Sequence, residues 1–184
     1  MPPMEQNDFP ALVDAAKRGD IGAQEQLVLH YQRRLAGFVF AITGSMESVE
    51  DLTQAVFIKV LLGLPKLADP AKFQPWLFRI ARNVCLDHLR GEKWRARFTA
   101  YRVEHDEVPE PTKAVPLEIE WLRDALLALP IKQRELVTLL QEEDFSYEEL
   151  AQITNSTLSS VKSRLFRARE TLNEWRNREH QRVE

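Results

Sequence analysis

The stretch from Arg97 to Pro116 interrupts an otherwise helix-like sequence and divides the 184 residues into two parts. It shows little apolar periodicity and holds three prolines, each of which removes a backbone donor that a helix needs. It also carries most of the local acid, namely Glu104, Asp106, Glu107 and Glu110. Residues 97–116 are therefore predicted to be a flexible acidic linker between two small domains.

On both sides of this linker, apolar residues recur at three- and four-residue steps, which is typical of helices that bury one face. Only 6 glycines are present, and no long run alternates apolar with polar residues, so strands are not expected. We predict an all-α fold with a helical bundle at residues 8–96 and a second helical domain at residues 117–180. The predicted helices are Leu12–Arg18, Ile21–Thr43, Val49–Leu64, Gln74–Arg90, Leu117–Leu129, Lys132–Glu142, Tyr147–Ile153 and Leu158 to about Asn177.

Positive charge is concentrated in two blocks, although the net charge of −3 by itself argues against general nucleic-acid binding. One block runs from Arg79 to Arg97 and contains only two acids. The other runs from Ser156 to Arg169 and contains none. Because local basic patches are the electrostatic signature of nucleic-acid binding, both blocks are candidate DNA-binding surfaces.

An enzyme is not expected from the titratable side chains. The four histidines show no metal-ligand spacing, and Cys85, the only cysteine, has no sequence cue to a partner base. We therefore expect no catalysis, metal, cofactor or small-molecule substrate. The single cysteine, the lack of a signal-peptide pattern and the lack of a long apolar stretch favour the cytoplasm.

The second domain contains a helix-turn-helix pattern. Ser146 and Glu149 have the spacing of a capping box, which opens a short helix. A turn at residues 154–156 follows, and then a longer helix begins. Leu158, Val161, Leu165, Ala168 and Leu172 share the apolar face of that helix.

The opposite face of the longer helix carries Ser159, Ser160, Ser163 and Arg167, flanked by Lys162 and Arg164. Small hydroxyls allow close approach to base edges, an arginine can bond guanine through two acceptors, and flanking cations suit phosphates. The alternative is an amphipathic helix whose basic face is simply solvated.

The helix from Trp76 to Arg90 presents a second candidate DNA surface. Arg79, Arg82, Asn83 and Arg90 cluster on one arc of it, and the aromatic residues Phe73, Trp76, Phe78 and Trp94 lie nearby. Cations that follow phosphates and rings that stack on bases are the chemistry of single-stranded DNA binding. For Trp76 and Phe78 the alternative is a place in the core.

The helix Val49–Leu64 is apolar on two faces. Leu52, Val56 and Val60 form one face, and Phe57, Ile58 and Leu61 lie on the other. Either this helix runs through the middle of the bundle, or its second face docks on a partner. The pattern alone leaves both interpretations open.

Several segments together resemble bacterial RNA polymerase sigma factors of the extracytoplasmic-function (ECF) type. The resemblance covers nearly the whole chain and rests on EDLTQAVFIK at residues 50–59, WLFRIARN at 76–83, Leu129-Pro130, FSYEELA at 145–151 and VKSRLFRAR at 161–169. One departure is the run NSTLSS at residues 155–160, where such proteins often have a proline and a glycine. Ser156 or Thr157 can still cap the helix, but the family's usual promoter sequence is not assumed.

The resemblance implies a factor that directs core RNA polymerase to promoters of stress or envelope genes, through sigma region 2 (residues 8–96) and sigma region 4 (residues 117–180). It places Asp51, Gln54, Phe57 and Ile58 on the β′ clamp helices of the polymerase, which favours docking for the doubly apolar helix. It implies a second contact at the β flap, an acidic linker in the RNA-exit path and an anti-sigma factor that holds the chain at the membrane.

For promoter DNA, the resemblance implies that the loop from about Leu67 to Phe73 helps to melt the minus-ten element. The implied minus-ten contacts are Lys72, Phe73, Arg79, Arg82, Asn83 and Arg90. The implied minus-thirty-five contacts are Ser159, Ser160, Lys162, Ser163, Arg164 and Arg167. The alternative is a stand-alone helix-turn-helix regulator, which would leave the doubly apolar helix unexplained and would not bind core polymerase.

Overall fold

The computed structural model describes residues 9–99, 123–141 and 145–183. Every regular element within these ranges is an α-helix or a short 3₁₀-helix, which confirms the all-α prediction. The predicted linker from residue 100 onward and residues 117–122 of the predicted helix Leu117–Leu129 lie outside the described residues. Residues 97–99, predicted as linker, are instead the helical end of α4 (Phe73–Thr99).

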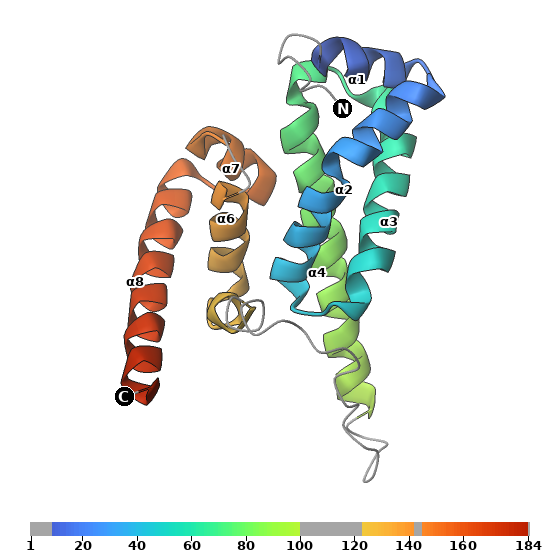
Figure 1. Cartoon of the computed structure of the whole chain (residues 1–184). Helices are drawn as coiled ribbons and strands as arrows, with labels where there is room; N and C mark the ends of the chain where they lie inside the picture. Colours follow the sequence, from blue (N-terminus) through green and yellow to red (C-terminus); the bar gives the residue numbers. More distant parts are fainter. Residues whose placement is uncertain (1–8, 100–122, 142–144, 184) are drawn as a thin grey trace.

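The first domain is a helical bundle (Figure 1). Helices α2 (Ile21–Thr43), α3 (Glu47–Gly63) and α4 lie side by side, and α1 (Phe9–Lys17) lies across one end of them. The 3₁₀-helices η1 (Leu64–Lys66) and η2 (Pro70–Lys72) connect α3 to α4. This connection is the loop that was expected to take part in promoter melting.

Both ends of α2 are set by the residues that cap it. The carboxylate of Asp20 accepts a hydrogen bond from the Ala23 amide at 2.9 Å and so begins the helix. Gly44 ends it with φ at 71°, a left-handed conformation that favours glycine. A Cβ atom at this position would lie 2.9 Å from the Leu127 side chain. Glycine therefore also lets the helical residues 123–127 approach the end of α2.

The second domain holds the predicted helix-turn-helix. It consists of residues 123–127, α6 (Ile131–Gln141), α7 (Tyr147–Thr154) and α8 (Leu158–Val183). The capping box is confirmed, because Ser146 Oγ accepts from the Glu149 amide while the Ser146 amide donates to the Glu149 carboxylate. The turn has Asn155 at φ 49°, and Thr157 Oγ1 accepts from the Ser160 amide at the start of α8.

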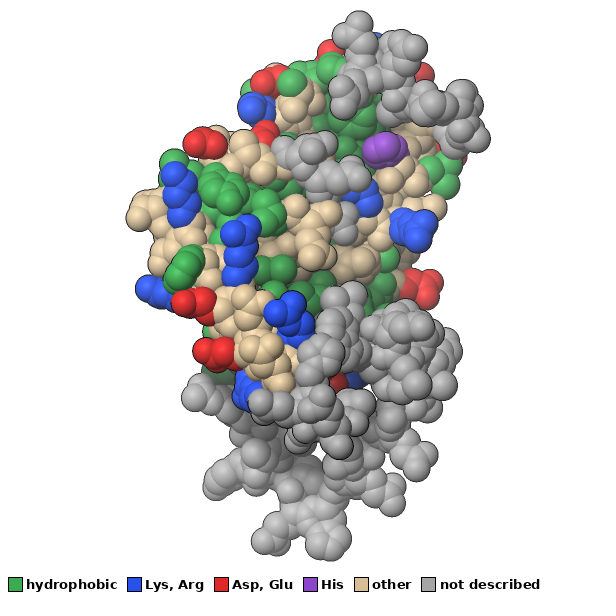
Figure 2. Space-filling view, turned by 60° about the vertical axis from the view of Figure 1, so that its left-hand side comes forward, with side chains coloured by type: hydrophobic (Ala, Val, Ile, Leu, Met, Phe, Trp, Pro, Cys, Tyr) green, Lys and Arg blue, Asp and Glu red, His purple; other side chains and the backbone are tan. Residues whose placement is uncertain are grey.

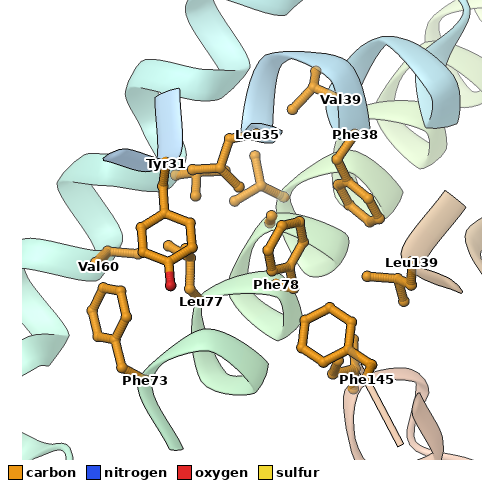
Figure 3. Close-up of a cluster of buried hydrophobic side chains, with 14 of the residues drawn as sticks. Tyr31, Leu35, Phe38, Val39, Val60, Phe73, Leu77, Phe78, Leu139 and Phe145 are labelled. Atoms are coloured by element: carbon orange, nitrogen blue, oxygen red, sulfur yellow. The ribbon is translucent and has the colours of Figure 1, made fainter. Parts of the chain in front are cut away.

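The two domains share one continuous hydrophobic core. Helix α6 packs against α2, and α7 packs against α4. Phe78 of α4 is fully buried, with its ring edge-on to Phe38 in the first domain and to Phe145 in the second, at centroid distances of 5.5 Å each (Figure 3). A single aromatic side chain therefore joins both parts of the core.

Two buried groups on α2 and α4 make the fold sensitive to alkaline pH. Burial raises the pKa of the Cys85 thiol from 9.0 to about 12, and burial also raises the pKa of Tyr31 from 10.0 to about 12. Both groups favour the protonated form in the folded state. Their contribution is complete below the unfolded pKa values and is lost as pH rises towards the folded ones.

We expect the free energy of unfolding to fall by about 2 kcal/mol or more between pH 9 and pH 11, measured by urea denaturation. Cys85→Ala removes one of the two groups and should make this fall shallower. If the free energy of unfolding falls equally steeply with pH in the wild-type and Cys85→Ala proteins, the role assigned to the buried thiol is contradicted.

Candidate functional site

The predicted recognition face on α8 is open to solvent. Ser159, Lys162, Ser163 and Arg167 are exposed, and Ser160 and Arg164 are half-buried. On the opposite side Val161, Leu165 and Ala168 are buried in the domain core, as the helical pattern predicted. The space-filling view brings the α8 side of the molecule forward and shows separate Lys and Arg side chains spread over it (Figure 2). The face therefore offers hydroxyl and cationic groups on a helix fixed by its apolar side.

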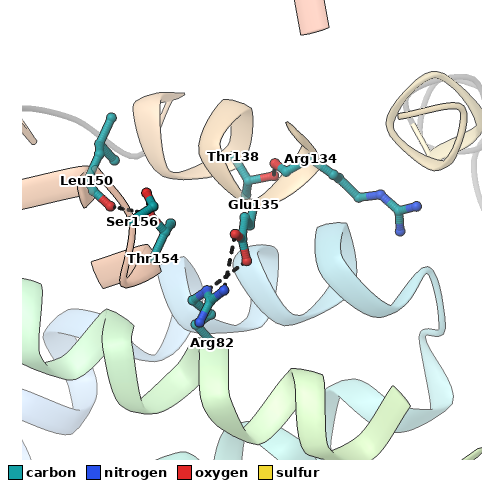
Figure 4. A network of polar contacts seen from close by, with 7 residues as sticks. All are labelled: Arg82, Arg134, Glu135, Thr138, Leu150, Thr154 and Ser156. Carbon is teal, nitrogen blue, oxygen red and sulfur yellow. Dashed lines mark hydrogen bonds and ion pairs between the residues drawn. The ribbon is translucent and has the colours of Figure 1, made fainter. Parts of the chain in front are cut away.

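The predicted DNA surface on α4 is partly exposed and partly paired. Arg79 and Asn83 are exposed, and Arg90 is exposed while it bonds Asp87 at 2.7 Å on the same helix. Arg82 is turned towards the second domain. Its Nε donates to Glu135 Oε2 at 2.7 Å and its Nη2 donates to Glu135 Oε1 at 3.2 Å (Figure 4).

Phe73, predicted as a DNA contact, is instead a core residue with 1% of its surface exposed. Its ring lies 5.6 Å from that of Tyr31 and 5.9 Å from that of Phe9, between α1 and α2. The ring is thus closed to a nucleobase in this arrangement, because it fills the end of the bundle. The alternative of a core position holds for Phe78, whereas Trp76 is only half-buried.

A hollow of about 340 Å³ lies beside the connection between α3 and α4. The first domain lines it with the cations of Lys66, Lys72 and Arg79 and with the Trp76 ring. Gln152 and Ile153 of α7 form the other wall. Asp69 also lines the hollow, so three cations and one acid lie around the Trp76 ring. An aromatic surface with an excess of positive charge around it is suited to a base and its phosphates. This is where the loop from Leu67 to Phe73 was expected to act.

A groove of about 660 Å³ runs between α2 and α3. Gln54, Phe57 and Ile58 line it, and Ile58 is 53% exposed. Asp51 is exposed on the same helix but does not line the groove. Because Val56 and Val60 fill the core on the other side, α3 lies at the surface and does not run through the middle of the bundle.

Sequence reasoning missed two charged residues on α6, Arg134 and Glu135, which are both buried. The Arg134 guanidinium donates to the carbonyls of Ile42 (3.0 Å), Leu129 (3.1 Å) and Leu127 (3.3 Å), and burial lowers its pKa. In the sequence, Arg134 and Glu135 are a neighbouring pair of opposite charges, which is typical of surface residues. The available signal was that Glu135 is four residues from both Ile131 and Leu139, on a face that turns inward.

The histidine and cysteine side chains form no catalytic arrangement in the part of the chain that is described. Burial and the nearby Arg34 cation lower the pKa of His30, whose ring packs edge-on against Tyr31. His88 lies 3.3 Å from Glu92 on the same helix. Among the described residues no group of three His, Cys, Asp or Glu is placed to hold a metal ion, and no helix is long and apolar enough to cross a membrane.

The described residues combine a helix-turn-helix that has a basic face, a second basic helix beside an aromatic hollow, and an open apolar groove. These features are typical of a DNA-binding factor that docks on a protein partner. Residues 27–95 match the family model for Sigma-70 region 2, and residues 119–172 match that for Sigma-70 region 4. The chain belongs to the sigma-70 family as an ECF sigma factor. It is a non-catalytic subunit that directs RNA polymerase to promoters.

Relatives match along nearly the whole chain. The RNA polymerase sigma-H factor of Pseudomonas aeruginosa is 31% identical over 92% of this chain and 94% of its own length. The ECF RNA polymerase sigma-E factor of Escherichia coli is 31% identical over 91% of this chain and 94% of its own. Because these matches include both domains, the alternative of a stand-alone helix-turn-helix regulator is excluded.

Two solved structures share the fold, and both are complexes. CnrH, solved with the cytosolic domain of CnrY, is similar with a TM-score of 0.73 at 25% identity, over 92% of this chain and 97% of that chain. RpoE of Bartonella quintana, solved with the anti-sigma factor NepR, is similar with a TM-score of 0.69 at 26% identity, over 82% of this chain and 94% of that chain.

Proposed function

We propose that the exposed face of α8 reads the minus-thirty-five element of the promoter. The observation that carries this assignment is the set of exposed hydroxyl and cationic side chains on a helix whose other face is buried. Ser159, Ser160, Ser163 and Arg167 approach base edges, while Lys162 and Arg164 hold phosphates. The hydroxyl-rich start of α8 gives the chain a base preference of its own.

The α4 surface and the hollow beside it hold the melted minus-ten strand. The exposed Arg79 and Asn83, the hollow beside Trp76 and the cations Lys72, Arg82 and Arg90 support this assignment. Trp76 offers a ring for stacking, and the Asn83 amide reads the edge of a flipped base. Phe73 supports this surface from the core rather than touching DNA.

The α2–α3 groove receives the β′ clamp helices of core RNA polymerase. Its apolar lining with Gln54, Phe57 and Ile58 suits a helix that lays one face into a groove, and Asp51 adds charge nearby. The second domain contacts the β flap, and the acidic linker lies in the RNA-exit path, where its charge resembles that of RNA.

The chain acts in the cytoplasm, and an anti-sigma factor holds it inactive, at the membrane where that partner is membrane-bound. The two structural relatives support this, because one was solved with an anti-sigma factor and the other with the cytosolic domain of a second protein. Release from such a partner would switch on genes of a stress or envelope response.

Run-off transcription with purified core polymerase on a promoter library tests the function. The wild-type chain should give promoter-selective transcripts. Arg167→Ala should reduce them about tenfold to a hundredfold, because one arginine contact to a base is worth about 1–3 kcal/mol. Arg176→Ala, at an exposed position further along α8, is the matched control and should transcribe normally. Equal activity of the Arg167→Ala and Arg176→Ala proteins would rule out the assigned reading face.

Asn83→Ala should leave polymerase binding intact and reduce promoter melting about tenfold, since the amide contact to an unstacked base is lost. Permanganate reactivity of unpaired thymines in the minus-ten element measures this directly. Asn173→Ala changes an exposed amide on α8 in the same way and should melt the promoter normally. Normal melting by the Asn83→Ala protein would show that another residue captures the base.

A further inference from the structure

The outer face of α2 carries apolar surface that the proposed docking groove does not use. Ile21 is 71% exposed and Leu29 is 55% exposed, and neither lines the α2–α3 groove. Both line a second hollow of about 330 Å³, which has only Val28 and Leu61 in common with the groove. We infer that this face binds a second copy of the chain, with the two α2 helices antiparallel and crossing at Leu29.

The exposed charges of α2 are complementary about Leu29. Glu25 lies four residues before it and Arg33 four residues after it, and both side chains are exposed on the same side of the helix. When two antiparallel copies of α2 meet at Leu29, each Glu25 therefore lies at the same height as Arg33 of the second copy. Among the described residues, neither Glu25 nor Arg33 forms an ion pair within its own chain. The symmetric arrangement gives both of them a partner, twice over.

Other exposed positions of α2 obey the same symmetry. Gln26 and Gln32 lie three residues on either side of Leu29, and their amides can donate to and accept from each other. Ile21 and Gly37 lie eight residues on either side, so a large side chain meets a glycine that leaves room for it. A two-fold interface needs this property, because each residue meets the residue at the mirrored position. A second copy of the chain is therefore the partner that this face fits.

The dimer covers part of the groove proposed for polymerase. Gln32, Arg33 and Ala36 form the α2 wall of that groove, and they lie in the half of α2 that the second copy occupies. Polymerase and the second copy therefore compete for α2, a step that rests on the proposed function of the groove. Because one pair of helices makes a small interface, we expect a weak dimer with a Kd of about 10 µM. Binding of polymerase to the monomer then dissociates the dimer by mass action.

Sedimentation equilibrium of the full chain over a range of concentrations tests the dimer. The mass of the wild-type protein should rise from that of one chain towards that of two. Glu25→Arg places like charges opposite Arg33 at two symmetric sites, and Arg33→Glu does the same opposite Glu25. Each of these single substitutions should weaken dimerisation about tenfold, because two attractive pairs become repulsive.

A mixture of the two single variants is the sharpest test of the antiparallel register. Glu25→Arg and Arg33→Glu proteins in equal amounts should dimerise with each other about as tightly as the wild type, because opposite charges meet again at both sites. The double Glu25→Arg/Arg33→Glu protein should also recover dimerisation. Glu148→Arg on α7 and Arg176→Glu on α8, at exposed positions, are the controls and should dimerise like the wild type. Circular dichroism confirms that each variant is folded.

Three outcomes would overturn the inference. A wild-type chain that stays monomeric at every concentration excludes the dimer. A Glu25→Arg protein that dimerises like the wild type shows that α2 is not the contact face. A mixture of the two single variants that stays monomeric excludes the antiparallel register centred on Leu29.

Native mass spectrometry of core polymerase with excess wild-type chain tests the competition. We expect one chain per polymerase. Two chains per polymerase would show that the dimer and the polymerase do not share α2. A polymerase with no bound chain would instead refute the proposed docking function, and the sedimentation results would still decide whether the dimer exists.

Discussion

Replacing Ile58 with glutamate is expected to weaken binding to core RNA polymerase about 100-fold, because it puts a carboxylate into an apolar contact. Ile58 is 53% exposed in the α2–α3 groove, while Val56 and Val60, two residues before and after it on the opposite face of α3, are buried. The side chain therefore contributes little to the bundle core and is open to the docking proposed above. Fluorescence anisotropy of the labelled chain, titrated with core polymerase, measures the affinity.

Leu62→Glu is the control for this substitution. Leu62 is an apolar residue of the same helix that is 76% exposed but does not line the groove. The same change of charge should therefore leave the affinity nearly unaltered. If both variants lose binding equally, the effect comes from general charge repulsion or a wider contact surface, and the groove is not the docking site.

Phe78→Ala is expected to lower the free energy of unfolding by about 3–5 kcal/mol, as is usual when a fully buried phenylalanine is truncated. The ring packs between Phe38 and Phe145, so its loss opens a cavity between the two domains as well as within the first (Figure 3). Thermal and urea unfolding followed by circular dichroism measure the change. The transition should also broaden or split, because the domains lose a shared contact.

Phe166→Ala is the matched control, since Phe166 is 63% exposed on α8. Its truncation should change the stability by no more than about 0.5 kcal/mol. A loss below about 1 kcal/mol in the Phe78→Ala protein would mean that neighbouring side chains collapse into the space, and the two domains would then be joined mainly through polar contacts.

Local patterns predicted the helices because each helix carries its own signals. The Ser146 and Glu149 pair opens α7, and the apolar steps from Val161 to Ala168 bury one face of α8, as expected. The exposed face of α8 followed directly from this, because a helix with one buried side must present the other. Its hydroxyl and basic residues were therefore identified together with the fold.

Contacts between distant segments were not predictable in the same way. Arg82 and Glu135 are 53 residues apart. Arg82 was predicted to face DNA, and Glu135 looked like an ordinary surface charge in its own helix. Periodicity shows that a face is buried but not which element covers it. The packing of α7 on α4 could therefore not be predicted from the spacing of apolar residues. Phe73 was misplaced for a related reason, since an aromatic residue beside cations has the same local pattern in a core as in a binding surface.

The contact between the two domains at the end of α2 depends on the glycine at position 44. Its φ of 71° and the approach of Leu127 mean that even one added methyl group would strain the end of α2 and require Leu127 to turn away. No residue assigned to DNA or to polymerase lies at this point. A substitution at position 44 would therefore act on the packing between the domains and leave the side chains proposed for promoter recognition unchanged.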